Sequence, residues 1–341
     1  MVAAVKGGKI SIQPELEFTQ FSTRYDPATS AIWCWMSPTP LPCVTTRLLD
    51  EVAQLQSQLT ATYNNQSSDT VWPFRHLILA SKVPGIYNLG GDLELFKDCI
   101  ISKNEDCLRA YAHKCVSLLH QNINNLDLPI TMVALVQGQA MGGGLETALS
   151  CDVIVAERNA QMGFPEILFN LFPGMGAYNL LARRIGPSLA ERIILSGKTY
   201  SAEEFYEMGV VDVLAEIGEG EIAVEKYLRS HNQSHHTIAS MKKIRQIVHP
   251  ISQKSLFEVV DIWVDAALAL NRKDLVKLER LLHAQHALKS RRTMTDVNTS
   301  KVPRRGDWRK IEDIEFPLIT HLGENIFRNR RQTSRRKANV D

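Results

Sequence analysis

The chain has 341 residues, of which 44% are hydrophobic and 22% charged, with a formal net charge of +2 at pH 7. This composition is typical of an ordinary globular protein that is large enough for a sizeable core and an internal pocket. It excludes binding to a polyanion through overall charge alone. No apolar run approaches the ~20 residues that a membrane-spanning helix needs.

The first half of the chain alternates predicted strands with predicted helices. Residues 1–15 are expected to be loosely ordered. The predicted strands are 16–24, 31–36, 76–81 and 132–136, and the predicted helices run from Thr45 or Thr46 to about Ala61, onward from Leu93, and over 106–122. This alternation favours an α/β fold with largely parallel strands.

The second half is predicted to be mainly helical. A helix opens at Leu145, and its neighbours are strands at 153–156 and 210–213, helices at 177–185 and 188–196, a helix capped by Ser201, and successive helices over 221–288. We expect three regions: a core over 1–220, a helical region over 221–290 that covers a pocket, and a tail over 291–341.

Charge is distributed unevenly between the body and this tail. Residues 289–341 hold 14 Lys and Arg against 7 Asp and Glu, so the preceding residues hold 25 basic and 30 acidic side chains. We interpret the segment as a basic, partly flexible and solvated tail. The alternatives are an acidic protein partner and, in third place, nucleic acid; we expect neither nucleic-acid binding nor membrane insertion.

The six cysteines form neither a C-x-x-C pair nor a zinc-type spacing. The N-terminus shows no charged segment followed by an apolar signal core. We therefore expect reduced thiols, a cytoplasmic location and no metal site.

Two glycine-rich loops each follow an apolar strand, Gly90-Gly91-Asp92 and Gly142-Gly143-Gly144. The second is neither G-x-G-x-x-G nor a P-loop, so it does not support nucleotide binding. In a parallel sheet both loops would lie at the carboxyl ends of strands, where ligands bind. One N–H from each could converge on a single carbonyl oxygen as an oxyanion hole. The alternative is two tight turns with structural glycines.

Two glutamates flank the second glycine loop and the strand after it. Glu146 lies two residues past the triple glycine, and Glu166 follows 20 residues later in an apolar loop. Paired carboxylates in such surroundings are expected to have raised pKa values and to share acid and base work. The alternative makes Glu146 a helix-dipole partner and Glu166 a surface residue.

These motifs resemble the crotonase family, the enoyl-CoA hydratase/isomerase superfamily, over roughly residues 11–285. The densest parts are Asn88-Leu89-Gly90-Gly91-Asp92-Leu93, Gly138 to Glu146, Cys151 to Ala156, Ala160 to Glu166 and Phe172 to Ala177. The resemblance implies the ClpP/crotonase fold, a spiral core of ββα units with a C-terminal helical region. It also implies catalysis by Glu146 and Glu166, oxyanion donors at Gly91 or Gly90 and at Gly143, and no cofactor besides the thioester carrier.

The first loop departs from the ordinary family pattern, because it carries Asp92-Leu93-Glu94 and lacks the usual lysine. Together with the basic tail and the helical region, this loop is similar to that of diffusible signal factor synthases. That resemblance implies dehydration of a 3-hydroxyacyl thioester on acyl carrier protein, then hydrolysis to a free cis-2-unsaturated fatty acid that serves in quorum sensing. The alternatives are an ordinary enoyl-CoA hydratase and a non-catalytic interaction module.

The same resemblance suggests an acyl pocket and several partners. Ordinary core packing is the alternative for each residue of the proposed pocket: Met141, Gly142, Leu168, Leu171, Met175, Trp263 and Leu281. Acyl carrier protein is the expected partner, with Arg183, Arg184 and the tail arginines as its contacts. A cognate signal receptor and a homotrimer are further possibilities.

Overall fold

The structure is a computed structural model that describes residues 2–6, 9–13, 18–65, 72, 74–231 and 235–298. The chain divides into two compact units, Met1–Glu279 and Arg280–Asp341. The candidate site lies in the first of these units. Most of the basic tail lies outside the described residues, so its proposed role and the boundaries of the three expected regions stay predictions.

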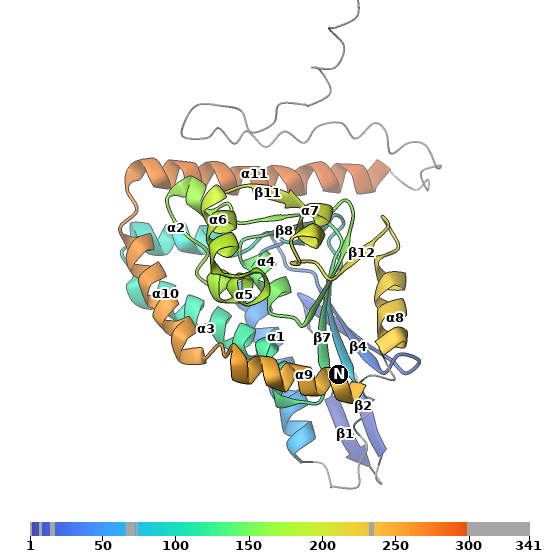
Figure 1. Cartoon of the computed structure of the whole chain (residues 1–341). Helices are drawn as coiled ribbons and strands as arrows, with labels where there is room; N and C mark the ends of the chain where they lie inside the picture. Colours follow the sequence, from blue (N-terminus) through green and yellow to red (C-terminus); the bar gives the residue numbers. More distant parts are fainter. Residues whose placement is uncertain are drawn as a thin grey trace, which may run out of the picture. The chain divides into compact units, whose positions relative to one another are not determined.

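The larger of two central sheets has six strands in the order β12-β9-β7-β5-β4-β3 (Figure 1). Neighbouring strands are parallel except for β3 and β4. The strands are β3 (Phe21–Asp26), β4 (Ala31–Met36), β5 (His76–Ser81), β7 (Thr131–Val136), β9 (Val153–Glu157) and β12 (Val213–Ala215). The α/β fold and the mainly parallel sheet predicted from sequence are therefore confirmed.

The smaller sheet has four short strands in the order β11-β10-β8-β6, of which only β11 is antiparallel to its neighbour. These strands are β6 (Ile86–Asn88), β8 (Gln139–Met141), β10 (Gln161–Gly163) and β11 (Thr199–Ser201). None of the four was predicted, because a three-residue strand carries no periodicity of its own and forms only by pairing with its neighbours.

Helices surround the sheets. Their bounds are α1 (Thr46–Asn64), α2 (Leu93–Ile101), α3 (Glu105–Ile123), α4 (Gly143–Leu149), α5 (Ala177–Ile185), α6 (Pro187–Ser196), α7 (Ala202–Glu207), α8 (Gly220–His231), α9 (His235–Val248), α10 (Gln253–Leu268) and α11 (Arg272–Asn298), with 3-10 turns η1 (Asn125–Asp127) and η2 (Glu166–Phe169). None of the helices among the described residues combines the length and apolarity required to cross a membrane.

Both faces of the six-stranded sheet are covered by helices. Val224 and Leu228 of α8 pack on one face, against Trp33, Ile78 and Leu135. In Figure 1 helices α1 and α3 lie on the opposite side of the sheet from α8. The alternating side chains of each strand thus enter two separate apolar layers, which explains why the strands read as continuous hydrophobic runs.

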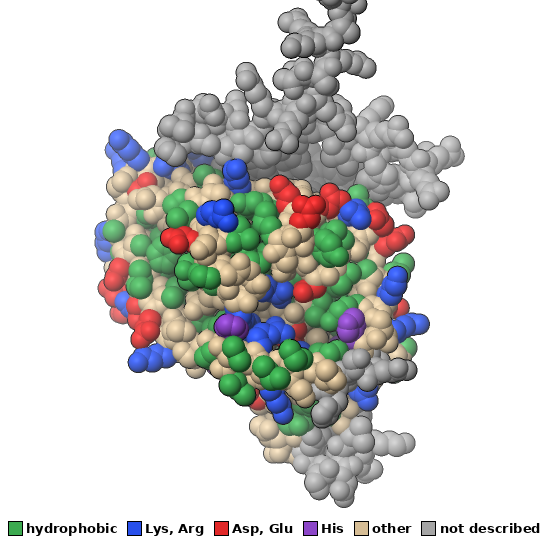
Figure 2. Space-filling model, viewed as in Figure 1, with side chains coloured by type: hydrophobic (Ala, Val, Ile, Leu, Met, Phe, Trp, Pro, Cys, Tyr) green, Lys and Arg blue, Asp and Glu red, His purple; other side chains and the backbone are tan. Residues whose placement is uncertain are grey.

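Local signals account for the helix ends. Thr45 caps α1 by accepting a hydrogen bond from the Leu48 N–H, and Ser201 and Glu204 form a capping box on α7, both as expected. Helix α9 carries exposed apolar side chains, among them Ile244 and Ile247. Hydrophobic side chains gather over α9 on the face shown in Figure 2.

Two predictions were wrong: that the first residues are loosely ordered, and that a strand covers residues 210–213. The first residues form an antiparallel pair of strands, β1 (Val2–Lys6) and β2 (Lys9–Gln13). Two consecutive glycines lie between these strands in the sequence, which is a hairpin signal. The expected strand at 210–213 begins only at Val213. The N–H groups of Val210 and Val211 instead donate to the Phe205 carbonyl oxygen at 2.8 and 3.1 Å and close the end of α7.

Candidate active site

The two glycine loops leave neighbouring strands of the smaller sheet. Strands β6 and β8 are parallel and pair Asn88 with Ala140, so both chains turn away from the sheet at the same edge. The first loop then leads into α2, which Asp92 caps, and the second leads into α4. The predicted meeting of the loops at the carboxyl ends of parallel strands is thus present, on two strands that the sequence did not reveal.

The loops approach each other so closely that side chains would not fit between them. A Cβ added to Gly143 would lie 3.4 Å from the Gly91 nitrogen, and one added to Gly90 would lie 3.1 Å from the Gly143 nitrogen. A Cβ on Gly144 would collide with the Asn88 carbonyl oxygen at 2.1 Å. Glycine is therefore required here for the contact between two backbones.

Two backbone N–H groups remain available in this gap. The Gly90 N–H donates to Asn88 Oδ1 at 2.8 Å. Within the described ranges, by contrast, no acceptor is found for the N–H of Gly91 or of Gly143. The prediction left Gly90 and Gly91 open as the first donor; the geometry favours Gly91, paired with Gly143.

Glu146 lies in α4 with 1% of its surface exposed. Its Oε1 accepts hydrogen bonds from the N–H groups of Met175 and Ala177, at 2.7 and 2.9 Å. Burial, followed by repulsion from Glu166, raises the pKa of Glu146 to about 8, although these two hydrogen bonds oppose the rise. A carboxyl group at this position can therefore exchange a proton near neutral pH.

Glu166 begins η2, and its carboxylate lies against the second glycine loop. A Cβ added to Gly142 would stand 2.3 Å from Glu166 Oε1. The other oxygen, Oε2, is enclosed and has no hydrogen-bond partner in the described part of the chain. Burial raises the pKa of Glu166 to about 8. Both glutamates thus have the raised pKa values expected from the apolar sequence around them.

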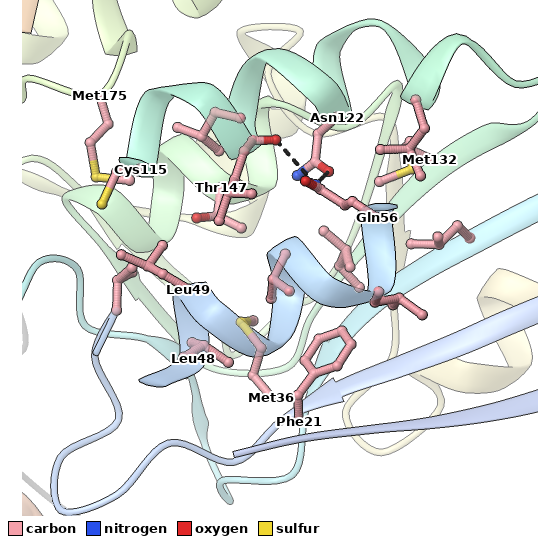
Figure 3. A pocket seen from close by; sticks show the side chains of 18 residues that line it. Phe21, Met36, Leu48, Leu49, Gln56, Cys115, Asn122, Met132, Thr147 and Met175 are labelled. Carbon is pink, nitrogen blue, oxygen red and sulfur yellow. Dashed lines mark hydrogen bonds between the residues drawn. The ribbon is translucent and has the colours of Figure 1, made fainter. Parts of the chain in front are cut away.

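An apolar pocket lies between the larger sheet and helices α1 and α3 (Figure 3). Val44 and Met175 place it beside the glycine loops, since the Val44 N–H donates to the Gly90 carbonyl oxygen and Met175 Sδ approaches Gly143. The lining residues are Phe21, Met36, Val44, Leu48, Leu49, Val52, Leu55, Gln56, Leu77, Leu79, Cys115, Leu118, Leu119, Asn122, Leu126, Met132, Thr147 and Met175. The pocket is therefore an apolar space that adjoins the two glycine loops.

Of the residues that were predicted to line an acyl pocket, only Met175 lines this pocket. Trp263 instead packs on the Phe96 ring, with centroids 5.0 Å apart, and against Gly174. Leu168 lies against Gly197, and Met141, Gly142 and Leu171 do not line the pocket either. Leu281 belongs to the second unit, and its assignment stays a prediction. The residues that line this pocket occupy ordinary amphipathic core positions of the sequence, and the acyl role of the predicted residues stays a prediction.

One predicted contact for an acidic carrier is also engaged elsewhere. Arg184 donates to Asp212 Oδ2 at 3.1 Å and to the Cys151 carbonyl oxygen at 2.9 Å, so its guanidinium stabilises the body of the protein. Burial lowers the pKa of the neighbouring Arg183 to about 10. The proposed contact of Arg183 and Arg184 with an acidic carrier stays a prediction.

A sequence model described as enoyl-CoA hydratase/isomerase matches residues 52–265, which is more than half of the chain and includes both glutamates. The chain belongs to this family. It is 36% identical over 161 residues to mouse methylglutaconyl-CoA hydratase, a match that covers 45% of this chain and 47% of the relative. The chain thus spans about half the length of the curated relatives that it matches.

Solved structures of the family share the fold. Pseudomonas aeruginosa DspI is 25% identical, covers 74% of this chain and 97% of its own, and superposes with a TM-score of 0.57. Enoyl-CoA hydratase from Bacillus halodurans superposes with a TM-score of 0.62 at 21% identity, covering 76% of this chain and 99% of its own, which shows the fold alone. The predicted crotonase fold is confirmed.

Hydratases of this family act on CoA thioesters without a metal or other cofactor, in agreement with the prediction from sequence. Over the described ranges, no group of three or more His, Cys, Asp or Glu side chains is arranged to hold a metal ion.

Proposed function

We propose that the chain catalyses addition of water to the α,β-double bond of a 2-enoyl thioester, or the reverse dehydration of a 3-hydroxyacyl thioester. The observation that carries the proposal is the pair of carboxyl groups with raised pKa values beside two unengaged backbone N–H groups. The N–H groups of Gly91 and Gly143 stabilise the enolate oxygen that forms as water adds to Cβ.

The hydrogen bonds to Glu146 support one assignment of the two proton transfers. Two N–H donors favour the ionised form of Glu146, so it takes the proton from the attacking water. Glu166 receives no such donors at Oε2 and carries the proton that is delivered to Cα. The pair takes one proton from water and gives one to Cα. One of the two carboxyl groups is therefore ionised and the other protonated, both before and after the reaction.

Hydration of 2-enoyl-CoA thioesters, followed by loss of the enoyl absorbance, tests this function. Glu146→Gln and Glu166→Gln should each lower kcat by ~100- to 10,000-fold, because each removes one proton transfer. Glu203→Gln, on exposed α7, should leave kcat unchanged. Wild-type protein that hydrates no thioester of any length, or full activity in both glutamine variants, would reject the proposal.

A second candidate is synthesis of a cis-2-unsaturated fatty-acid signal from a 3-hydroxyacyl thioester on acyl carrier protein. It is supported by the first glycine loop, where residues 88–94 contain no lysine and Glu94 stands in the first turn of α2. After dehydration, a water activated by a glutamate attacks the thioester carbonyl, the C–S bond breaks, and the thiol leaves with a proton. The same N–H pair stabilises the tetrahedral oxyanion.

Incubation with a 3-hydroxyacyl carrier protein separates the two candidates. Release of the free cis-2-enoic acid, detected by mass spectrometry, would favour signal synthesis. Fast hydration of crotonyl-CoA with no free acid would favour an ordinary hydratase. A receptor partner belongs with the second candidate, and it stays a prediction, as do a cytoplasmic location and a trimer.

A further inference from the structure

Asn88 ends β6 immediately before the first glycine loop and is completely buried. Its side-chain Oδ1 accepts the Gly90 N–H at 2.8 Å, a hydrogen bond two residues along the chain that holds a tight turn. Gly90 adopts a φ of +96°, a conformation that this turn needs and that glycine tolerates. The hydrogen bond therefore removes Gly90 as a donor and fixes the peptide before it.

The next peptide plane is fixed from the other side. The Gly90 carbonyl oxygen accepts the Val44 N–H at 2.7 Å. Because C=O and N–H point in opposite directions across a planar trans peptide, the Gly91 N–H must point away from Val44. Asn88 and Val44 together thus determine where the N–H of Gly91 is aimed.

Asn88 also sets the spacing between the two loops. Its backbone pairs with Ala140 on β8, and a Cβ added to Gly144 would lie only 2.1 Å from the Asn88 carbonyl oxygen. The Asn88 Nδ2 group, however, has no partner among the described residues. A buried donor without a partner costs stability, so an apolar residue would suit the core better unless Oδ1 is needed.

We propose that Asn88 is a positioning residue of the oxyanion hole, which turns the Gly90 N–H aside so that the Gly91 N–H faces the thioester oxygen. The inference rests on the proposed function, because it assigns a role within the hydration site. Asn88 itself touches no reacting atom. Its effect is exerted through the conformation of the Gly90–Gly91 peptide.

The test compares Asn88→Leu and Asn88→Ala, which lack the acceptor, with Asn88→Asp, which keeps it. Misdirecting one oxyanion donor should lower kcat by about 10- to 100-fold with KM within about threefold, less than the ~100- to 1000-fold cost of deleting a donor. Asn88→Asp should keep more of kcat than either apolar variant. The matched control is Asn65→Ala, at the exposed end of α1, which should leave kcat and KM unchanged.

A spectroscopic measurement separates positioning from a general loss of stability. The carbonyl stretching frequency of a bound, isotope-labelled enoyl thioester falls when the oxyanion hole polarises the carbonyl group. In Asn88→Ala it should move back toward its value in water, while circular dichroism stays that of the wild type. If Asn88→Leu does not fold, Asn88→Ala decides the question.

The outcomes distinguish this inference from the function on which it rests. Inactive wild-type protein would overturn both. An active wild type with inactive Glu146→Gln and Glu166→Gln variants, combined with an Asn88→Ala variant of unchanged kcat and carbonyl frequency, would overturn the role of Asn88 alone.

Discussion

The carboxylate of Glu166 lies against the backbone of Gly142, close enough that a methyl group on this glycine would stand 2.3 Å from Oε1. This contact joins the end of the F-P-E segment to the start of α4, although 24 residues separate the two positions. It places the acid group proposed for Cα protonation beside the loop that supplies the Gly143 N–H.

Replacing Gly142 with alanine should therefore displace Glu166 and lower kcat by at least about 100-fold, the scale of one lost acid–base group. Gly218→Ala is the matched control, since Gly218 also has a positive φ but no atom within 4 Å of an added Cβ. Both variants should lose about 1 kcal/mol of stability from backbone strain. Equal activity in the two variants would show that the Glu166 contact does not matter.

The two raised pKa values predict a bell-shaped dependence of kcat/KM on pH with its maximum near pH 8. Activity should rise as the pair loses its first proton and fall as it loses the second, with apparent pKa values that belong to the pair. In Glu166→Gln the falling limb should disappear from the residual activity. A flat profile between pH 6 and 9 would contradict a shared proton.

Stability should also depend on Glu146 in a pH-dependent way. Its folded-state pKa of about 8 lies above the ordinary value of 4.5, so the folded state holds the proton more tightly. The resulting stabilisation is complete below about pH 4.5 and is lost as the pH rises through about 8. Glu146→Gln keeps the Oε1 acceptor and cannot ionise.

The Tm of Glu146→Gln relative to wild type should therefore increase from pH 5 to pH 9, by several degrees if the shift is of the stated size. Calorimetry at a series of pH values gives the difference. Glu221→Gln, exposed in the first turn of α8, serves as the control and should show no such trend. A constant difference across this range would mean that burial does not raise the pKa of Glu146.

If the apolar pocket between the larger sheet and helices α1 and α3 receives the acyl chain, activity should depend on the length of that chain. Val52 lines it from α1, so the ring in Val52→Phe should fill space that a long acyl tail needs. We expect at least a tenfold loss of kcat/KM for long-chain thioesters, with the rate for crotonyl-CoA retained, since each buried CH₂ contributes about 0.8 kcal/mol. Gln54→Phe, exposed on the same helix, should leave both rates unchanged. Equal effects on short and long substrates would place the tail elsewhere.

Sequence patterns predicted the elements whose signals are local. The apolar run of β5 and the helix α5, stopped by Gly186, were placed to the residue, because burial on both faces and a helix-ending glycine are visible in the chain. Glu146 and Glu166 were predicted from their motifs and from the family resemblance, and their catalytic roles stay a proposal. The short strands β6 and β8 were missed, since their pairing is a tertiary event.

The apolar pocket shows what could not be predicted from sequence. Val52, Leu55 and Leu119 recur at helical spacing, and nothing in a single sequence separates a residue that packs on its neighbours from one that borders a cavity. The role of Asn88 was equally invisible, because a hydrogen bond to Gly90 acquires its meaning only when Val44 and the second loop are in place.

Two amide side chains that line the pocket, Gln56 and Asn122, lie away from Met175 and are hydrogen-bonded to each other (Figure 3). Gln56 Nε2 donates to Asn122 Oδ1 at 2.9 Å, Asn122 Nδ2 donates to Ser150 Oγ at 3.1 Å, and Ser150 Oγ donates to the Thr147 carbonyl oxygen at 2.6 Å. This series of hydrogen bonds ends on α4, the seven-residue helix whose first turn presents Gly143 and Glu146. Under the proposed function, an acyl chain that reached Gln56 and Asn122 would contact residues hydrogen-bonded to the helix that carries Glu146, and chain length would then be coupled to the geometry of the candidate site.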